Sequence, residues 1–297
     1  MAAALATLFA AAACVPQSTS SAPASPPPAV VAAPVPQPPP PPPAPTRAVF
    51  ELEGDVQQGG VIRGIAPDGT QSLSLNGTPV TLAGDGAFIV AFGRDFSGAA
   101  TLSATLADGR SVTEQLRVAP TDWQISHVNA SPRGGVSSEA FRRRRAPELA
   151  QIVAAREIRS ETDGWRQDFL WPATGRISSV FGSQRIYRGT PGSYHSGVDI
   201  AQPTGTPIVA PADGVVILVA DAPFTLEGHL LMIDHGMGLN SAFLHLSRID
   251  VAEGQRVARG QRIGAIGATG RATGPHLHWS MKWRDERIDP QLLAGPM

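Results

Sequence analysis

The sequence is poor in several residue types, and each shortage narrows what the protein can be. Its 297 residues include one cysteine, Cys14, so a zinc finger is excluded and no disulfide framework holds the chain together. The formal net charge of −1 argues against a nucleic-acid partner. Only 6% of the residues are aromatic, so the cores must rest on Ala, Val, Leu and Ile, which suits β-rich modules of modest size.

The N-terminal apolar run, residues 2–13, is too short to span a bilayer but suits the core of a signal peptide. Cys14 follows the small residues Ala11, Ala12 and Ala13 and resembles the lipidated cysteine of bacterial lipoprotein signals, although Ala11 replaces the usual leucine and no Lys or Arg precedes the core. The alternative is an ordinary secretory signal with an incidental cysteine. Either interpretation predicts an exported protein, and we expect membrane contact only through a lipid anchor on Cys14.

The rest of the chain divides by composition. Residues 15–45 are rich in proline and predict an extended tether. Residues 46–120 contain strand-length segments in which apolar residues alternate with polar ones or run together. Turn signals such as Asn76-Gly77 and Asp108-Gly109 separate these segments, which predicts a small antiparallel β-sandwich, immunoglobulin-like in outline. Residues 121–168 are interpreted as a connector with a helix at about 147–158, opened by Pro147. Residues 169–297 read as glycine-punctuated strands and predict an antiparallel sheet, so the fold class is mainly β.

Two motifs in the last third carry the chemistry. His276 and His278 lie two apart, so on a strand their side chains share one face, with Cα atoms roughly 6.6 Å apart. His195 and Asp199 lie four apart, and a straight strand would separate their Cα atoms by roughly 13 Å. A shared ion therefore requires a bend, which Gly197 permits. Imidazoles and a carboxylate are the donor set of a catalytic zinc.

These motifs resemble those of the lysostaphin-type (LytM-like) zinc metallopeptidases, which cut peptide cross-links in bacterial peptidoglycan. The resemblance runs from about Phe169 to about Pro290 and includes the segments His195-x-x-x-Asp199, Leu244-His245-Leu246-Ser247 and Gly274-Pro275-His276-Leu277-His278. It implies one Zn²⁺ per chain, with ligands His195, Asp199 and His278. The same resemblance assigns His245 and His276 as catalytic histidines that are not ligands.

Three protein ligands leave one zinc position for a water, and the net charge of about +1 lowers the pKa of that water toward about 7. One of the two remaining histidines would take the proton of the water and pass it to the leaving amine, and the other would donate to the developing oxyanion. The sequence leaves open which histidine has which role. Tyr194 and Arg185, close to the first ligand, are candidate substrate-binding residues.

Two alternatives of other classes remain. The first is a non-catalytic wall-binding or amidase-activating protein of the same fold, whose signature would be the loss of a ligand, and no ligand position is changed here. The second is a biotin- or lipoyl-carrier-like module, because residues 251–261 are similar to the hairpin of those carriers. Carriers need a turn lysine, whereas the only lysine here, Lys282, lies outside that hairpin.

The sequence therefore predicts a zinc endopeptidase that remodels the cell wall. Its expected partners are peptidoglycan stem peptides, and regulatory proteins are possible further partners. Its expected location is the periplasm of a Gram-negative bacterium.

Overall fold

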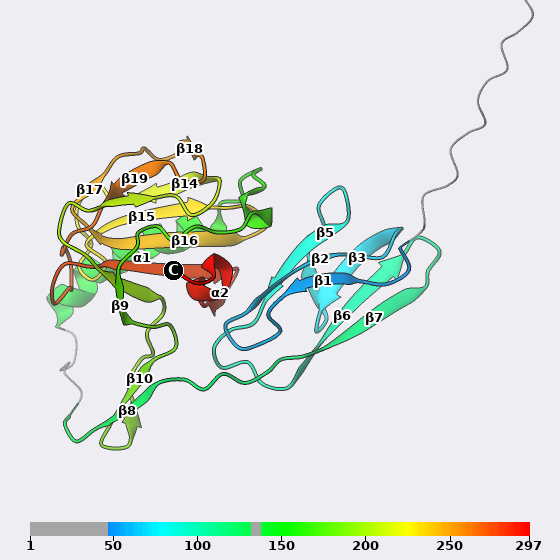
Figure 1. Cartoon of the computed structure of the whole chain (residues 1–297), viewed down its shortest axis with the longest axis horizontal. Coiled ribbons are helices and arrows are strands. Elements are labelled where there is room, and N and C mark those ends of the chain that lie inside the picture. The colour runs from blue at the N-terminus through cyan, green and yellow to red at the C-terminus, as the bar shows by residue number, and fades with distance from the viewer. Residues whose placement is uncertain (1–46, 132–137) are drawn as a thin grey trace, which may run out of the picture. The chain divides into compact units, whose positions relative to one another are not determined.

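Strands dominate the structure, a computed structural model that describes residues 47–131 and 138–297 (Figure 1). The mainly β class predicted from the sequence is confirmed. The predicted signal peptide, Cys14 and the proline-rich tether lie outside the described residues. Among the helices that are described, none combines the length and the apolar character needed to cross a bilayer.

The first seven strands form two sheets. Three strands pair in the order β1-β2-β5 and four in the order β4-β3-β6-β7, all antiparallel. Strand β5 is buried along its whole length, and on β6 every second residue is buried, so both sheets contribute to one apolar core. The bounds are β1 Glu51–Gly54, β2 Val61–Ile65, β3 Thr70–Leu75, β4 Thr78–Val80, β5 Ala87–Ala91, β6 Ala99–Leu106 and β7 Ser111–Arg117.

The helix after these strands begins earlier than predicted. Helix α1 spans Glu139–Glu157, where the sequence predicted about 147–158, and Pro147 lies inside it rather than in its first turn. Ser138 caps the start of the helix, because its Oγ accepts a hydrogen bond from the Phe141 amide at 3.1 Å. An internal proline removes one helical hydrogen bond, which ordinarily costs about 3 kcal/mol. Contacts with the following domain offset that cost.

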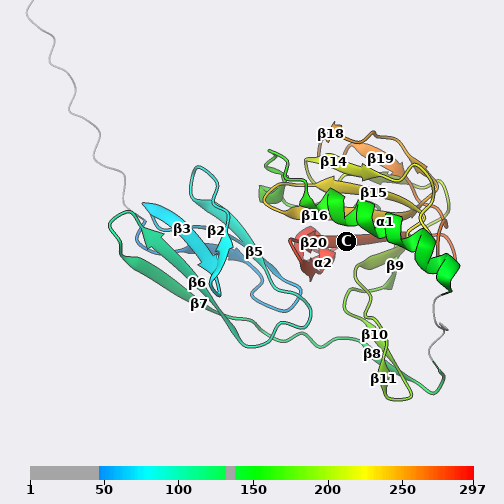
Figure 2. The same ribbon diagram turned by 180° about the vertical axis from the view of Figure 1, so that it is seen from behind.

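Those contacts come from the polar and the apolar side of α1. Arg145 donates two hydrogen bonds to the Glu227 carboxylate at 2.5 and 2.6 Å. Ile152 and Ala155 are buried against strands β14 to β16, whereas Leu149 and Val153 are exposed. Figure 2 shows α1 lying across these strands.

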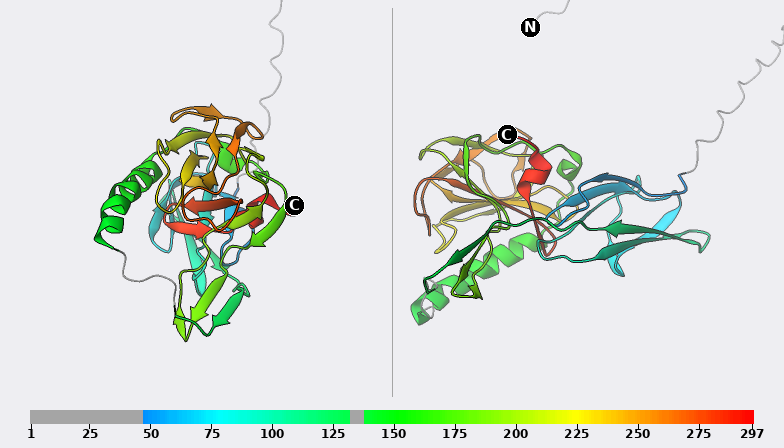
Figure 3. Two further views of the ribbon diagram at one scale, coloured as in Figure 1. Left: turned by 90° about the vertical axis from the view of Figure 1, so that its left-hand side faces the viewer. Right: turned by 60° about the horizontal axis from the view of Figure 1, so that its bottom comes forward.

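The main sheet has eight antiparallel strands in the order β18-β14-β15-β16-β20-β12-β9, with β21 paired to β20. Figure 3 shows this sheet with α1 alongside it. Its strands are β9 Arg176–Ser179, β12 Val198–Ala201, β14 Gly214–Val219, β15 His229–Asp234, β16 Leu239–Leu246, β18 Arg256–Val257, β20 Leu277–Trp283 and β21 Glu286–Ile288.

Two small sheets and two short helices complete the described chain. One sheet has the order β13-β19-β17, and the other has the order β11-β10-β8, in which β8 and β10 run parallel. Their bounds are β8 Ile125–Val128, β10 Gln184–Tyr187, β11 Thr190–Pro191, β13 Pro207–Val209, β17 Arg248–Ile249 and β19 Arg262–Ala265. The 3-10 helix η1 spans Gly164–Arg166, and helix α2, which the sequence reading missed, spans Pro290–Ala294.

Strand β20 has two chemically distinct faces. Leu277, Trp279 and Met281 are at most 1% exposed and belong to the apolar core. The alternate residues, His278, Ser280 and Lys282, therefore point to the opposite face. The imidazole, the hydroxyl and the ammonium of this strand therefore all lie on that second face.

Candidate metal centre

Asp199 and His278 are brought together by strand pairing. Strands β12 and β20 are antiparallel neighbours, with Asp199 directly opposite His278 and Val198 opposite Trp279. Val198 and Trp279 are fully buried in the core, so the pleat turns Asp199 and His278 to the other face together. The Asp199 Oδ1 and His278 Nδ1 atoms lie 2.8 Å apart.

His195 reaches the same point from the loop before β12. Its Nε2 lies 3.1 Å from Asp199 Oδ1 and 3.0 Å from His278 Nδ1. Its other ring nitrogen, Nδ1, donates to the Val180 carbonyl at 3.0 Å, which fixes the tautomer and turns the Nε2 lone pair toward the cluster. The structure thus brings together the three predicted ligands, each offering one donor atom, with all donor atoms within 4.8 Å of one another.

Gly197 matters through space rather than through its backbone angles. A Cβ at this position would lie 2.3 Å from the Trp279 carbonyl oxygen and 2.9 Å from His278 Nε2. Only a glycine lets the chain pass this close to β20 between His195 and Asp199. The sequence reading gave Gly197 the role of permitting a bend, and the structure adds the close approach as its reason.

The electrostatics of the cluster match a cation site. Burial would raise the pKa of Asp199, but the interactions with the adjacent His195 and His278 rings outweigh it and hold that pKa well below its usual range. Burial lowers the pKa of His278. Two imidazole nitrogens and a carboxylate oxygen, all pointing at one space, form a donor set of the type that zinc prefers, and the residues present fit that metal.

His245 is turned toward this cluster by a β-bulge. The pairing of β15 with β16 shifts register between His229 and Leu231, and His245 adopts a left-handed backbone with φ of 63°. Leu244 already pairs with His278, so regular alternation would send His245 to the core face. The bulge re-aims it, as bulges beside functional sites do. Its ring centroid lies 4.8 Å from that of His276 and 6.3 Å from that of His278.

His245 and His276 are held in the same tautomer. Nδ1 of His245 donates to the Thr269 carbonyl at 2.8 Å, and Nδ1 of His276 donates to the Gly274 carbonyl at 2.8 Å. A carbonyl can only accept, so the neutral rings carry their lone pairs on Nε2. Nε2 of His276 lies 3.8 Å from Asp199 Oδ1. Burial, aided by the neighbouring histidines and opposed by the bond to the Thr269 carbonyl, lowers the pKa of His245, which favours the neutral base.

The predicted substrate-binding residues lie outside this cluster. Arg185 is exposed on strand β10, in a different sheet from Asp199 and His278. Tyr194 is half-buried with its ring 5.9 Å from that of Phe181 in an edge contact. Their roles toward substrate stay predictions, as does the lipidation of Cys14, which lies outside the described residues.

Sequence reasoning missed the groups that orient the ligands and bases. The carbonyls of Val180 and Thr269 carry no side-chain signal, so no motif could have found them. Thr269 stands in the glycine-rich stretch before His276, and that position was the one available hint.

Comparisons with known proteins agree with this geometry. The model of Peptidase family M23 matches residues 193–290, a range that contains all five residues discussed above. A crystal structure described as a putative peptidase M23 from Pseudomonas aeruginosa is 31% identical, with a TM-score of 0.62, covering 82% of this chain and 96% of that one.

Curated relatives match about two fifths of the chain. The chain is 42% identical over 123 residues to the peptidoglycan DD-endopeptidase ShyA of Vibrio cholerae, covering 41% of this chain and 28% of that protein. It is 40% identical over 125 residues to the DD-carboxypeptidase/endopeptidase Mpg of Neisseria meningitidis, covering 41% and 27%. The matched stretch thus spans under a third of these relatives.

The fold and the comparisons define a peptidase. The chain belongs to Peptidase family M23.

Proposed function

We propose that the protein is a zinc-dependent endopeptidase that hydrolyses peptide cross-links of bacterial peptidoglycan. The observation that carries the proposal is the pairing of Asp199 with His278 across β12 and β20, with His195 Nε2 within 3.1 Å of Asp199 Oδ1 and 3.0 Å of His278 Nδ1. These three residues would hold one Zn²⁺. When bound, the metal supplies a Lewis acid and lowers the pKa of a water toward about 7.

The chain's own residues would supply the proton transfers. His245 and His276 each present an unprotonated Nε2, because their Nδ1 atoms donate to carbonyls. One ring is positioned to accept the proton of the attacking water and return it to the leaving amine, and the other to stabilise charge on the scissile carbonyl oxygen once protonated. The two rings are held alike, so both are assigned as catalytic without dividing the roles.

The substrate and location follow from the relatives and the sequence. Two relatives named DD-endopeptidases support a bond between D-configured residues of the cross-link as the target. The N-terminal apolar run and Cys14 support export to the periplasm and a lipid anchor. The three intact ligand positions favour this function over the non-catalytic alternative of the same fold.

Zinc content and wall digestion test the proposal together. The purified chain should bind one zinc and release soluble muropeptides from peptidoglycan, should lose activity to a chelator and should regain it with zinc. Mass spectrometry of the products from defined cross-linked muropeptides would identify the bond. A His278→Ala protein should lose both metal and activity, and unimpaired turnover by that variant would refute the ligand assignment.

A further inference from the structure

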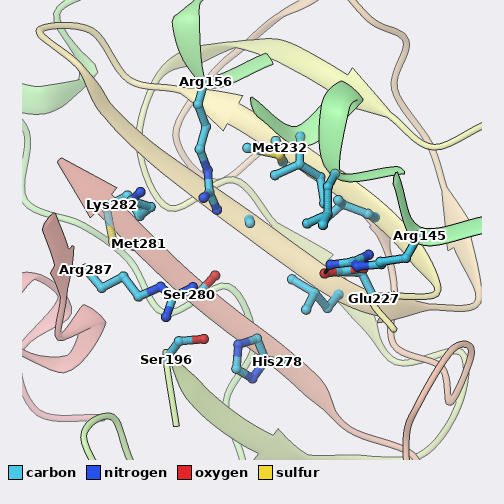
Figure 4. Close-up of a pocket in the computed structure, with 15 residues that line it drawn as sticks. Arg145, Arg156, Ser196, Glu227, Met232, His278, Ser280, Met281, Lys282 and Arg287 are labelled. Atoms are coloured by element: carbon cyan, nitrogen blue, oxygen red, sulfur yellow. Dashed lines mark hydrogen bonds and ion pairs between the residues drawn. The ribbon is translucent and has the colours of Figure 1, made fainter. Parts of the chain in front are cut away.

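A groove continues from the metal centre along the polar face of β20. His278, Ser280 and Lys282 stand on that face at intervals of two residues, so the Cα atom of Lys282 lies about 13 Å from that of His278. Ser196, next to His195, also lines the groove. The cavity there measures about 140 Å³ and is covered in part by α1 (Figure 4). One water needs about 10–15 Å³ of such space, so the cavity holds more than a single solvent molecule.

The far end of this groove gathers cations. Lys282 lies directly opposite Arg287 in the antiparallel pair of β20 and β21, an arrangement of like charges that destabilises a sheet. Arg156 reaches into the same cavity from α1, and Figure 4 shows Arg156 and Arg287 extending toward the strand that carries Ser280. Lys282 is the only lysine of the chain.

Little in the described structure neutralises these three cations. Within residues 47–131 and 138–297, neither Arg156 nor Arg287 forms an ion pair; the Arg287 guanidinium lies 5.9 Å from the Tyr194 ring. Lys282 lies 3.9 Å from Asp285, whose carboxylate is fully exposed. Glu227, the acid that lines the cavity, is already bound by Arg145.

One polar atom at this end is left without a partner. Arg156 Nε is buried and makes no hydrogen bond within the described residues, an arrangement that is costly for a charged group. Burial, followed by the charge of Arg287, lowers the pKa of Arg156 to about 10, and burial, followed by the charge of Arg156, lowers the pKa of Lys282. Burial and the neighbouring positive charge thus both disfavour the charged forms of Arg156 and Lys282.

We propose that Arg156, Lys282 and Arg287 form an anion subsite that receives a carboxylate of the peptide substrate. The inference rests on the proposed function, because the groove joins this subsite to the candidate metal centre. At 3.3–3.6 Å per residue, about four residues of extended peptide span the distance from His278. A bound carboxylate would offset the Lys282–Arg287 repulsion and give the Arg156 guanidinium an anionic partner. The subsite thus selects for a free carboxylate at a fixed distance from the scissile bond.

The test compares one cross-linked peptide substrate with its derivative in which every carboxylate has been converted to a carboxamide. We expect the wild-type protein to prefer the carboxylate substrate, and Arg287→Gln to raise KM for that substrate about tenfold while kcat changes less than twofold. The amidated substrate should show no difference between the two proteins. Arg156→Gln should act in the same direction. Arg143→Gln, an exposed change on the same helix, is the matched control and should leave both substrates unaffected.

Two further readouts separate the possible failures. Arg287→Gln should unfold at the same temperature as wild type or a higher one, because it removes a like-charge pair; a lower temperature would mark a structural role instead. Binding of N-acetyl-D-alanine and of its amide, followed by the amide NMR shifts of Ser280 and Lys282, needs no cleavage. Shifts caused by the acid alone support the subsite even if the chain cleaves neither substrate, an outcome that would refute the proposed function. Equal shifts from both probes, no shift from either, or an unchanged substrate preference in Arg287→Gln, overturn the subsite.

Discussion

His235 offers a direct test of the buried polar network behind the metal centre. Its side chain is fully buried, Nδ1 donates to the Asp213 carbonyl at 2.8 Å, and Nε2 accepts from the Ser241 hydroxyl at 2.9 Å. Ser241 Oγ in turn accepts from Trp279 Nε1 at 3.3 Å. Each donor in this row of hydrogen bonds has an acceptor only while His235 is neutral. A proton on Nε2 would make that atom a donor facing the Ser241 hydroxyl, which is itself donating to it.

The sign and size of the effect follow from the pKa. Burial, opposed by the bond to Asp213, lowers the pKa of His235 from 6.5 to about 4. Between these values the unfolded chain binds a proton that the folded chain does not, so stability is fully present above pH 6.5 and is lost as the pH falls toward 4. A difference of roughly 2.5 units at 1.36 kcal/mol each gives a loss of about 3 kcal/mol.

The assay is urea unfolding of wild type and His235→Asn at pH 7, 6, 5 and 4, both zinc-free. Asparagine can still donate to Asp213 but does not titrate in this range. The difference between the two free energies of unfolding cancels groups that titrate alike in both, including Asp289, whose buried carboxyl has its pKa raised to about 6. We expect the advantage of wild type to shrink by about 3 kcal/mol from pH 7 to pH 4. If the difference in free energy of unfolding between the two proteins did not change with pH, the reasoning would be refuted, because His235 would then have the same pKa in the folded and the unfolded protein.

Three further predictions concern the site and the anchor. Gly197→Ala should lower the free energy of unfolding by about 1–3 kcal/mol and weaken zinc binding, because its Cβ would lie 2.3 Å from the Trp279 carbonyl oxygen. Urea unfolding and metal titration measure the two effects. Gly84→Ala, where no atom lies within 4 Å, should change the free energy of unfolding by less than about 0.5 kcal/mol. Equal effects of the two changes would contradict the close approach. His245→Ala should keep its zinc but turn over about 100-fold more slowly, and loss of the metal would make His245 a ligand instead. Cys14→Ser should leave the membrane fraction of expressing cells, whereas retention there would refute lipid anchoring.

The sequence predicted the site better than the elements that build it. The spacing of His276 and His278 indicated a shared face, and both rings lie beside Asp199 Oδ1, at 3.8 and 2.8 Å. The four-residue gap from His195 to Asp199 indicated a bend, and their side chains approach to 3.1 Å. These predictions succeeded because strand alternation is a local property. The pairing of Asp199 opposite His278 could not be read locally, since register depends on how distant strands align.

The misses have the same cause. Pro147 is a good local signal for a helix start, but α1 begins at Glu139 because Ser138 caps it and Arg145 binds Glu227 across the fold. The position of His245 was also hidden, because alternation from Leu244 would place its ring in the core. Only the bulge, a feature of the pairing with β15, turns it to the site.

The candidate metal centre and the core share strand β20, so the alignment of the three candidate ligands depends on the packing of the core. Trp279 separates His278 from Ser280 in sequence, and its ring lies in the core, bonded through Ser241 to His235. A change that moves the Trp279 ring must therefore tilt β20 and shift His278 relative to Asp199, which is bound to the same strand. The donor atoms lie 2.8–3.1 Å apart, so a shift of a few tenths of an ångström changes the space left for a cation. The buried network is thus expected to set how well the ligands are aligned, although none of its members faces the substrate.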